Sequence, residues 1–297
     1  MVETLAPAKI NLCLRIYGKT DSRLHNLDSI VVFCQFGDKI SISPADHDSF
    51  CIRGQFAPAL TEPDNGKNLV IAARDAFRGN GGVCGAVAIR LDKEIPVGAG
   101  LGGGSADAAA TLRALNKIAT TPLSDDQLFD IATRLGSDVP VCLAATPHRI
   151  KGTGDVIYPL NEIHAGALVL VNPLVPLSTA AVFNQLCPPY NQPLPDINDH
   201  DAVRYCGFGN DLETAATTFV PEINELLRRL RQTPTCRAAQ MSGSGASCFG
   251  VFDDIAAATD AAATFETAGF WAKATKLYRS DAATDGVLSS SYTSFGK

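Results

Sequence analysis

Residues 95–107 read Ile-Pro-Val-Gly-Ala-Gly-Leu-Gly-Gly-Gly-Ser-Ala-Asp, and five of these thirteen residues are glycine. Glycine leaves the backbone free to take positive φ and to approach a ligand closely. Alanines follow Asp107, and we expect a helix here, with Ser105 as its N-cap and Asp107 in its first turn. A loop of free N–H groups that leads into a helix N-terminus predicts a phosphate-binding site.

Two better-known glycine loops fit this stretch less well. A Walker A loop ends in Gly-Lys-Ser/Thr, but no lysine stands between Gly104 and Ser105. The dinucleotide pattern G-x-G-x-x-G matches Gly98, Gly100 and Gly103, but that pattern belongs in a first βαβ unit, well before residue 95. A turn that only packs a helix on a sheet is the structural alternative, although it needs fewer glycines.

The composition is that of a globular protein, with 297 residues, 46% hydrophobic residues and a formal charge of −6. A mildly acidic chain is a poor candidate for binding nucleic acid or an anionic membrane. The sequence has no apolar run of the ~20 residues that span a membrane, and it does not start like a secretory signal. Nine cysteines without a C-x-x-C pair indicate reduced thiols, so we expect a cytoplasmic protein.

Residues 10–16 alternate between apolar side chains and Asn11, Cys13 and Arg15, which predicts a half-buried strand. Because side chains alternate across a strand, Lys9 and Asn11 share the face opposite the apolar one. The structural alternative for Lys9 is a solvated lysine at the start of a strand.

Further elements are expected on both sides of the glycine-rich loop. In the N-terminal half we predict strands over 29–36 and 39–43, separated by a turn at Gly37-Asp38, a helix over 68–77, a strand over 87–91 and a helix from Ser124 to Gly136. Asp138 then lies in a helix-to-strand turn, where its side chain either faces a cleft or merely completes the turn.

The C-terminal half alternates helices and strands, which indicates an α+β sandwich. We predict an irregular segment over 186–200, strands over 167–171, 248–252 and 271–277, helices from 221 and 254, and fraying at the end from 289. A second glycine motif, Ser242-Gly243-Ser244-Gly245-Ala246, precedes the strand at 248. The predicted domains are residues 1–160 and 161–297.

Three motifs together resemble the GHMP kinase superfamily over nearly the whole chain. They are Pro7-Ala8-Lys9-Ile10-Asn11, the loop over 98–107, and Gly243-Ser244-Gly245-Ala246. The resemblance implies a two-domain α+β fold, with a ribosomal S5 domain 2-like N-terminal domain that binds ATP and a ferredoxin-like C-terminal domain. Together with Leu135-Gly136-Ser137-Asp138-Val139-Pro140, the motifs look like the members that act on a cytidine-diphosphate-linked polyol in non-mevalonate isoprenoid biosynthesis.

The implied reaction is phosphorylation of a tertiary hydroxyl with ATP and Mg²⁺. Carried over by position, Asp138 is the base and Lys9 its partner, and a lysine at this place would favour the ionised form of the aspartate. Ser105 is the implied Mg²⁺ contact. The implied ATP-binding residues are Asn68, Lys93, Pro96, Gly98, Gly100, Leu101, Gly102, Gly103, Gly104, Ser105 and Ala106. The implied substrate-binding residues are Asn11, His25, Phe183, Gly243, Ser244 and Gly245.

One position departs from the family pattern. The family usually has Tyr-His where this chain has Leu24-His25, and that tyrosine is expected to stack on cytosine. Either Phe183 carries the stacking, with Leu24 making a weaker contact, or the preference for the base is relaxed.

Two other functions stay open from the sequence alone. The chain could be another GHMP kinase that acts on homoserine or mevalonate, or a nucleotide-binding protein without catalysis. The presence of both Lys9 and Asp138 argues against the second. The partner we expect is a small molecule, and the sequence is compatible with a monomer or a homodimer.

Overall fold

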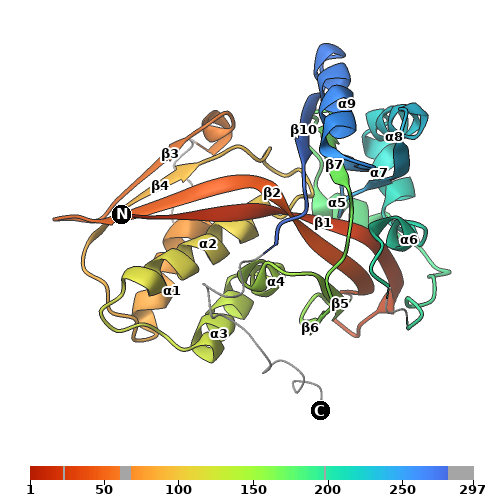
Figure 1. The fold of residues 1–297 in the computed structure, drawn as a ribbon. Coiled ribbons are helices and arrows are strands. Elements are labelled where there is room, and N and C mark those ends of the chain that lie inside the picture. The colour runs from red at the N-terminus through yellow and green to blue at the C-terminus, as the bar shows by residue number, and fades with distance from the viewer. Residues whose placement is uncertain (23, 61–67, 197–198, 280–297) are drawn as a thin grey trace.

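The computed structural model describes residues 1–22, 24–60, 68–196 and 199–279. Within them, a mixed sheet of six strands is followed by an antiparallel sheet of four (Figure 1). The predicted fraying of the last residues lies outside the described residues. Among the described helices, none has the length and apolar character to cross a membrane. The nine cysteines all lie in the described part and are free thiols.

The long hairpin of β1 and β2 organises the first sheet. Both strands are longer than predicted, and their antiparallel register runs from Val2↔Ile42 to Lys19↔His25. The order is β3-β4-β2-β5-β6, with β1 paired to β2. The strands are β1 (Val2–Lys19), β2 (His25–Pro44), β3 (Ser49–Arg53), β4 (Val87–Asp92), β5 (His148–Gly152) and β6 (Val156–Pro159).

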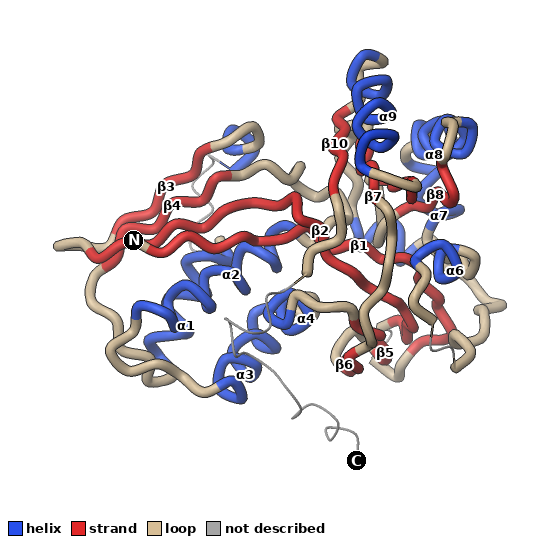
Figure 2. Tube along the Cα trace, viewed as in Figure 1, coloured by secondary structure: helices blue, strands red, loops and turns tan. Residues whose placement is uncertain are grey.

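Four α-helices lie together on one face of this sheet (Figure 2). The alanine-rich α2 packs directly on β1 and β2, so its small side chains allow a close approach between helix and sheet. The helices are α1 (Leu69–Gly79), α2 (Gly103–Ile118), α3 (Asp125–Leu135) and α4 (Val139–Ala144), and a 3₁₀ turn, η1 (Ala57–Leu60), follows β3. The predicted capping box of α3 is confirmed between Ser124 and Gln127.

The second sheet has the order β10-β7-β9-β8, and all its pairs are antiparallel. Helices α5 to α8 lie between β7 and β8 along the chain, and α9 lies between β9 and β10. With this strand order, β7-α8-β8 and β9-α9-β10 form the ferredoxin-like arrangement. Its elements, with the short helices between them, are β7 (Ala167–Asn172), α5 (Thr179–Asn184), α6 (Ala202–Cys206), α7 (Glu213–Phe219), α8 (Glu222–Gln232), β8 (Cys236–Met241), β9 (Cys248–Phe252), α9 (Ile255–Thr267) and β10 (Trp271–Thr275).

β1 belongs to the first sheet and also packs against the second. Ile10 and Leu12 pack with Phe249 and Leu170 of the second sheet, while Leu14 lies in the core under α7 and α8. The predicted boundary after residue 160 falls between β6 and β7, and the division into 1–160 and 161–297 stays a prediction.

The predicted turn at Gly37-Asp38 is wrong, because β2 is continuous through these residues. Gly37 pairs with Pro7, and a Cβ at this position would lie 2.2 Å from the carbonyl oxygen of Ala6. Asp38 is fully buried and accepts hydrogen bonds from the N–H groups of Glu94 and Ile95. Glycine here allows close strand packing, and the aspartate serves a buried contact, so neither marks a turn.

Asp138 also lies in a different setting from the predicted one. It is the N-cap residue of α4, so it joins two helices and not a helix and a strand. The apolar run after it, from Val139 to Leu143, is buried as a short helix against α2.

Candidate active site

A cavity of about 880 Å³ lies at the junction of the two sheets. One end is formed by the glycine-rich loop and α2, the middle by β1 and α4, and the other end by the start of β2 and α5. The sequence-predicted residues that line it are Lys9, Asn11, His25, Asn68, Lys93, Pro96, Gly98, Gly100, Gly102, Gly103, Gly104, Ser105, Asp138, Phe183, Gly243 and Ser244.

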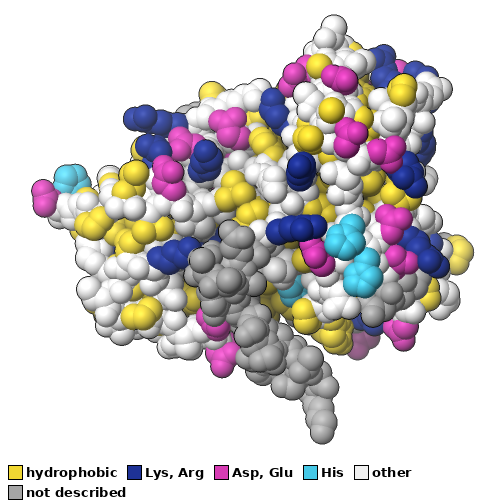
Figure 3. Space-filling view, viewed as in Figure 1, with side chains coloured by type: hydrophobic (Ala, Val, Ile, Leu, Met, Phe, Trp, Pro, Cys, Tyr) yellow, Lys and Arg dark blue, Asp and Glu magenta, His cyan; other side chains and the backbone are white. Residues whose placement is uncertain are grey.

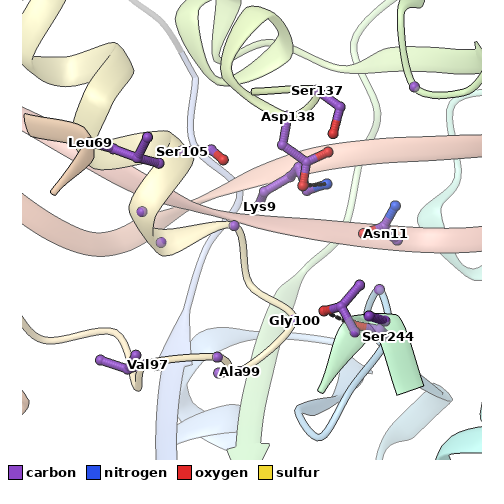
Figure 4. Close-up of a pocket in the computed structure, with 18 of the residues that line it drawn as sticks. Lys9, Asn11, Leu69, Val97, Ala99, Gly100, Ser105, Ser137, Asp138 and Ser244 are labelled. Carbon is purple, nitrogen blue, oxygen red and sulfur yellow. Dashed lines mark hydrogen bonds and ion pairs between the residues drawn. The ribbon is translucent and has the colours of Figure 1, made fainter. Parts of the chain in front are cut away.

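Lys9 and Asp138 meet in the middle of the cavity (Figure 4), where Lys9 Nζ is 2.8 Å from Asp138 Oδ2. The Lys9 side chain is 6% exposed and that of Asp138 is 40% exposed. Asp138 makes no side-chain capping bond to α4, so its carboxylate is left to face Lys9 and the cavity. The structure brings these two residues together as an ion pair, and their roles in catalysis stay a prediction.

The glycine-rich loop needs its glycines for conformation. Gly98, Gly100 and Gly102 all have positive φ, of 68°, 73° and 66°. Helix α2 begins at Gly103 with Gly102 as its N-cap, so the predicted N-cap at Ser105 is wrong. No side chain caps this described end of the helix, and its first N–H groups are therefore available to an anion.

Ser105 lies in the first turn of α2 and lines the cavity. Its hydroxyl has no hydrogen-bond partner among the described residues, and those residues hold no cluster of three or more His, Cys, Asp or Glu side chains that suits a metal ion. One free hydroxyl fits a Mg²⁺ ion that takes most of its ligands from phosphate oxygens and water.

Hydrogen bonds join the glycine-rich loop to the second glycine motif. Ser242 Oγ donates to the carbonyl of Gly100 at 3.1 Å and accepts from the N–H of Asn11 at 3.2 Å. The N–H of Ser247 donates to the carbonyl of Ala99. A Cβ on Gly100 would lie 2.6 Å from the carbonyl oxygens of Gly245 and Ser242, so the close contact requires glycine there.

Lys93 lies beneath the loop as a buried cation. Its ammonium donates to Asp38 and, at 2.9 Å, to Asp107 of α2. Burial lowers the pKa of Lys93, but the two carboxylates outweigh it and the net direction is upward. Burial, with Asp38 nearby, raises the pKa of Asp107 against the pull of Lys93. One cation neutralises one of two carboxylates, so the second retains a proton more readily.

The ion pairs of Lys93 bear on the predictions made for Asp107 and for Lys93. The predicted place of Asp107 in the first turn of the helix is wrong, because Asp107 lies beyond that turn, is buried and forms an ion pair with Lys93. Lys93 touches the cavity wall but its charge is already paired, so a nucleotide contact by this side chain stays a prediction.

Three predicted residues do not line the cavity. Leu101 and Ala106 are buried among hydrophobic side chains, and the Ala106 N–H donates to the carbonyl of Gly102. Gly245 packs against Met241 and Leu177. Asn68 does line the cavity, while its side chain also caps α1 by accepting from the N–H of Val70.

Asn11 has one end of its amide held and the other free. Its Nδ2 donates to Ser29 Oγ at 2.8 Å, and Ser29 donates onward to the carbonyl of Cys13. The Asn11 Oδ1 is buried and makes no hydrogen bond with the described residues. A buried acceptor without a partner is costly, so this oxygen suits a hydroxyl or N–H of a ligand.

His25 lies at the far end of the cavity with Leu24 and Phe183. The His25 and Phe183 rings are 5.3 Å apart, and the His25 Nε2 is buried without a described partner. Burial, and then the charge of Lys19, lower the pKa of His25, which favours the neutral form of the imidazole. Leu24 is 57% exposed and offers an aliphatic surface at the mouth.

The structure brings in residues that the sequence did not single out. Ser137 and Thr179 line the cavity, and Thr179 bonds Ser244. Asn210 donates to the carbonyls of Met241 and Gly243 and so shapes the second glycine motif. Nothing in the sequence near Asn210 marks it, since its partners are about thirty residues away.

Gly100→Ala tests the contact between the glycine motifs, with Gly98→Ala as its control. Both have positive φ, but a Cβ on Gly98 meets nothing within 4 Å. Gly98→Ala should therefore cost only the conformational strain of about 1–2 kcal/mol. Gly100→Ala should also separate the motifs and weaken ATP binding by a further tenfold or so. Calorimetric titration measures the ATP affinity of both variants. Equal affinities would contradict a role for the contact between the two glycine motifs.

Lys93→Met tests the buried charge cluster. The change leaves Asp38 and Asp107 buried without their cation, so we expect a loss of about 3–5 kcal/mol in the free energy of unfolding. Arg90→Met is the control, because Arg90 pairs with Asp92 at a site where it is 37% exposed, and should cost about 0–1 kcal/mol. Urea denaturation measures both, and a loss below 1 kcal/mol for Lys93→Met would refute a structural role.

Two family models match the chain. The GHMP kinases N terminal domain matches residues 68–146, which include the glycine-rich loop and Asp138, and the GHMP kinases C terminal domain matches residues 198–269. A solved structure of 4-(cytidine 5′-diphospho)-2C-methyl-D-erythritol kinase superposes with a TM-score of 0.79 at 30% identity, over 94% of this chain and 100% of that one. A homoserine kinase from Cytophaga hutchinsonii shares the fold, with a TM-score of 0.66 at 18% identity.

Close relatives agree over most of their length. The 4-diphosphocytidyl-2-C-methyl-D-erythritol kinase of Paramagnetospirillum magneticum is 42% identical over 263 residues, which cover 87% of this chain and 91% of the relative. The enzyme of the same name from Rhizobium etli is 43% identical over 265 residues, covering 89% and 90%. The chain therefore belongs to the 4-diphosphocytidyl-2-C-methyl-D-erythritol kinase family of the GHMP kinases.

Proposed function

We propose that this GHMP kinase transfers the γ-phosphoryl group of ATP to the 2-hydroxyl of 4-diphosphocytidyl-2-C-methyl-D-erythritol, a step of non-mevalonate isoprenoid biosynthesis. The observation that carries the proposal is the Lys9–Asp138 pair, which faces the open end of α2 within one cavity. Relatives with this activity in their names match the chain over about nine-tenths of its length.

The geometry supplies what phosphoryl transfer needs from a protein. The first N–H groups of α2 and the loop before it hold the phosphates of the donor. Asp138 takes the proton of the acceptor hydroxyl, and the hydroxyl oxygen attacks the γ-phosphorus as the bond to the β-phosphate oxygen breaks and ADP leaves. Lys9 holds the Asp138 carboxylate in place and offers positive charge to the hydroxyl oxygen.

Mg²⁺ neutralises charge on the phosphates when it is bound, and Ser105 is the protein group placed to contact it. The acceptor extends from Asp138 past Asn11 and the second glycine motif toward His25 and Phe183. The neutral imidazole of His25, with its unpartnered Nε2, suits the edge of the cytosine base, and Phe183 and Leu24 suit its faces.

The surface agrees with a small-molecule substrate. Acidic and basic side chains are interspersed over the face drawn in Figure 3, without a large basic area among its described residues. Together with the charge of −6, this disfavours nucleic acid as a partner. We also propose a cytoplasmic location, because all nine cysteines are free thiols.

Asp138→Asn tests the role of the carboxylate. Asparagine keeps the shape but cannot take the proton, so kcat should fall by roughly 10²–10⁴ while ATP still binds. Asp253→Asn, which alters an exposed ion pair with Arg237, is the control and should leave kcat unchanged. A coupled assay of ADP release measures both. Turnover only with homoserine or mevalonate would overturn the proposed acceptor, and an unchanged kcat in Asp138→Asn would remove Asp138 from the chemistry.

Leu24→Tyr tests the base-binding end. An aromatic ring at this exposed position can stack on cytosine, and stacking is worth roughly 1–3 kcal/mol per base. The acceptor KM should therefore fall by about fivefold or more, while the KM for ATP, which binds at the other end, stays the same. A neutral effect on the acceptor KM would mean that Leu24 does not face the base.

A further inference from the structure

The His25 imidazole contacts a second ring besides Phe183. Tyr190 lies edge-on to it, with ring centroids 6.1 Å apart and an interplanar angle of 83°. Tyr190 is outside the set of residues that line the cavity and packs instead with Leu186 and Phe183 against the core of the second sheet. Any effect of Tyr190 on a ligand is therefore indirect, and His25 is a cavity-lining residue whose ring it contacts.

Tyr190 comes from the irregular segment 186–196, which is fastened to the sheet just after this ring. The N–H of Asn191 donates to the carbonyl of Ile16, and its side chain donates to Asp211 at 2.7 Å. Asp211 also accepts from the N–H of Ile16 at 2.7 Å and from Arg15 at 3.0 Å. These hydrogen bonds are the first anchor. They hold the segment against the end of β1, next to β2, which begins at His25.

A second anchor lies at Leu194. Asp28 is completely buried, and Arg149 binds it through two hydrogen bonds of 2.9 and 2.8 Å. The backbone of Leu194 bonds both members of this ion pair. Its N–H donates to Asp28, and its carbonyl accepts from Arg149 at 2.6 Å. A buried, fully hydrogen-bonded ion pair fixes its surroundings firmly, so the segment has a defined path although it lacks regular secondary structure.

His25 itself has little else to orient its ring. It lies at the first position of β2, and the buried Nε2 has no hydrogen bond within the described residues. A ring without hydrogen bonds is oriented by packing, and its two aromatic neighbours are Phe183 and Tyr190. Phe183 also lines the cavity and is therefore available to the ligand, which leaves Tyr190 as the fixed support.

We propose that Tyr190 is a positioning residue for acceptor specificity, and that the anchored segment 186–196 holds its ring against His25 so that the imidazole Nε2 faces the base of the acceptor. The proposal rests on the proposed function for the identity of that base. The irregular segment 186–196 thus acts on the cavity without lining it at Tyr190.

Steady-state kinetics test the proposal with Tyr190→Ala and Tyr190→Phe. An edge-on aromatic contact corresponds to about a two- to tenfold change in binding, so Tyr190→Ala should raise the acceptor KM by that factor. The KM for ATP should not change, and Tyr190→Phe, which keeps the ring, should behave as wild type. Tyr158→Ala is the matched control, since this exposed tyrosine lies outside the cavity and should leave both constants unchanged.

A double-mutant cycle asks whether Tyr190 acts through His25. In a His25→Ala background, adding Tyr190→Ala should produce no further rise in the acceptor KM. Additive effects would overturn the proposal, and so would equal rises in both KM values, which indicate general loosening. If Tyr190→Ala does not fold, Tyr190→Leu keeps the apolar volume but removes the ring, and the same rise in acceptor KM is expected.

NMR titration of the His25 ring gives a readout without substrate. Losing Tyr190 exposes the imidazole, so its pKa should rise toward the ordinary value in Tyr190→Ala but not in Tyr158→Ala. The His25→Ala spectrum assigns the signal among the five histidines. If the wild type fails to use the cytidine-linked acceptor, the proposed function fails while this titration still decides the contact. An unchanged His25 pKa together with an unchanged acceptor KM refutes it.

Discussion

The buried ammonium of Lys93 is the interaction on which the phosphate end of the cavity depends. It joins three separate parts of the chain: Asp38 in the middle of β2, the strand end that leads into the glycine-rich loop, and Asp107 on α2. Asp38 also holds the N–H groups of Glu94 and Ile95, so the loop starts from a fixed point. A buried charge tolerates little displacement of its partners, because each loses its compensation when they move apart.

From this point the geometry of the site follows step by step. The loop begins after Ile95 and has positive φ at Gly98, Gly100 and Gly102. It ends where α2 begins at the cavity, without a side-chain cap. The carbonyl of Leu101 accepts from the N–H of Lys9, so the same loop also sets the position of the Lys9–Asp138 pair relative to the start of α2. The Ser242 hydroxyl of the second glycine motif donates to the carbonyl of Gly100, which links the glycine-rich loop to the second sheet. One connected set of hydrogen bonds thereby links the walls of the cavity.

Sequence reasoning succeeded where function and local pattern agree. The glycine-rich loop, the strand with Lys9 and Asn11, and the capping box of α3 all follow from spacing and residue type. It failed at Gly37-Asp38 and at Ser105, where local rules favour a turn and an N-cap. At Gly37-Asp38 the distant partners Pro7 and Lys93 decide the outcome. At Ser105 the left-handed conformation of the nearby Gly102 starts the helix earlier than the N-cap rule predicts.

The sequence by itself determined the class of protein, and it predicted the loop for the phosphate donor and the pair Lys9 and Asp138, because these depend on short motifs whose chemistry is local. Only the tertiary structure decided that Lys93 forms two buried ion pairs, that Leu101, Ala106 and Gly245 pack away from the cavity, and that the ring of Tyr190 contacts His25. Those roles arise from contacts between residues tens to more than a hundred positions apart, and spacing along the chain carries no record of such contacts.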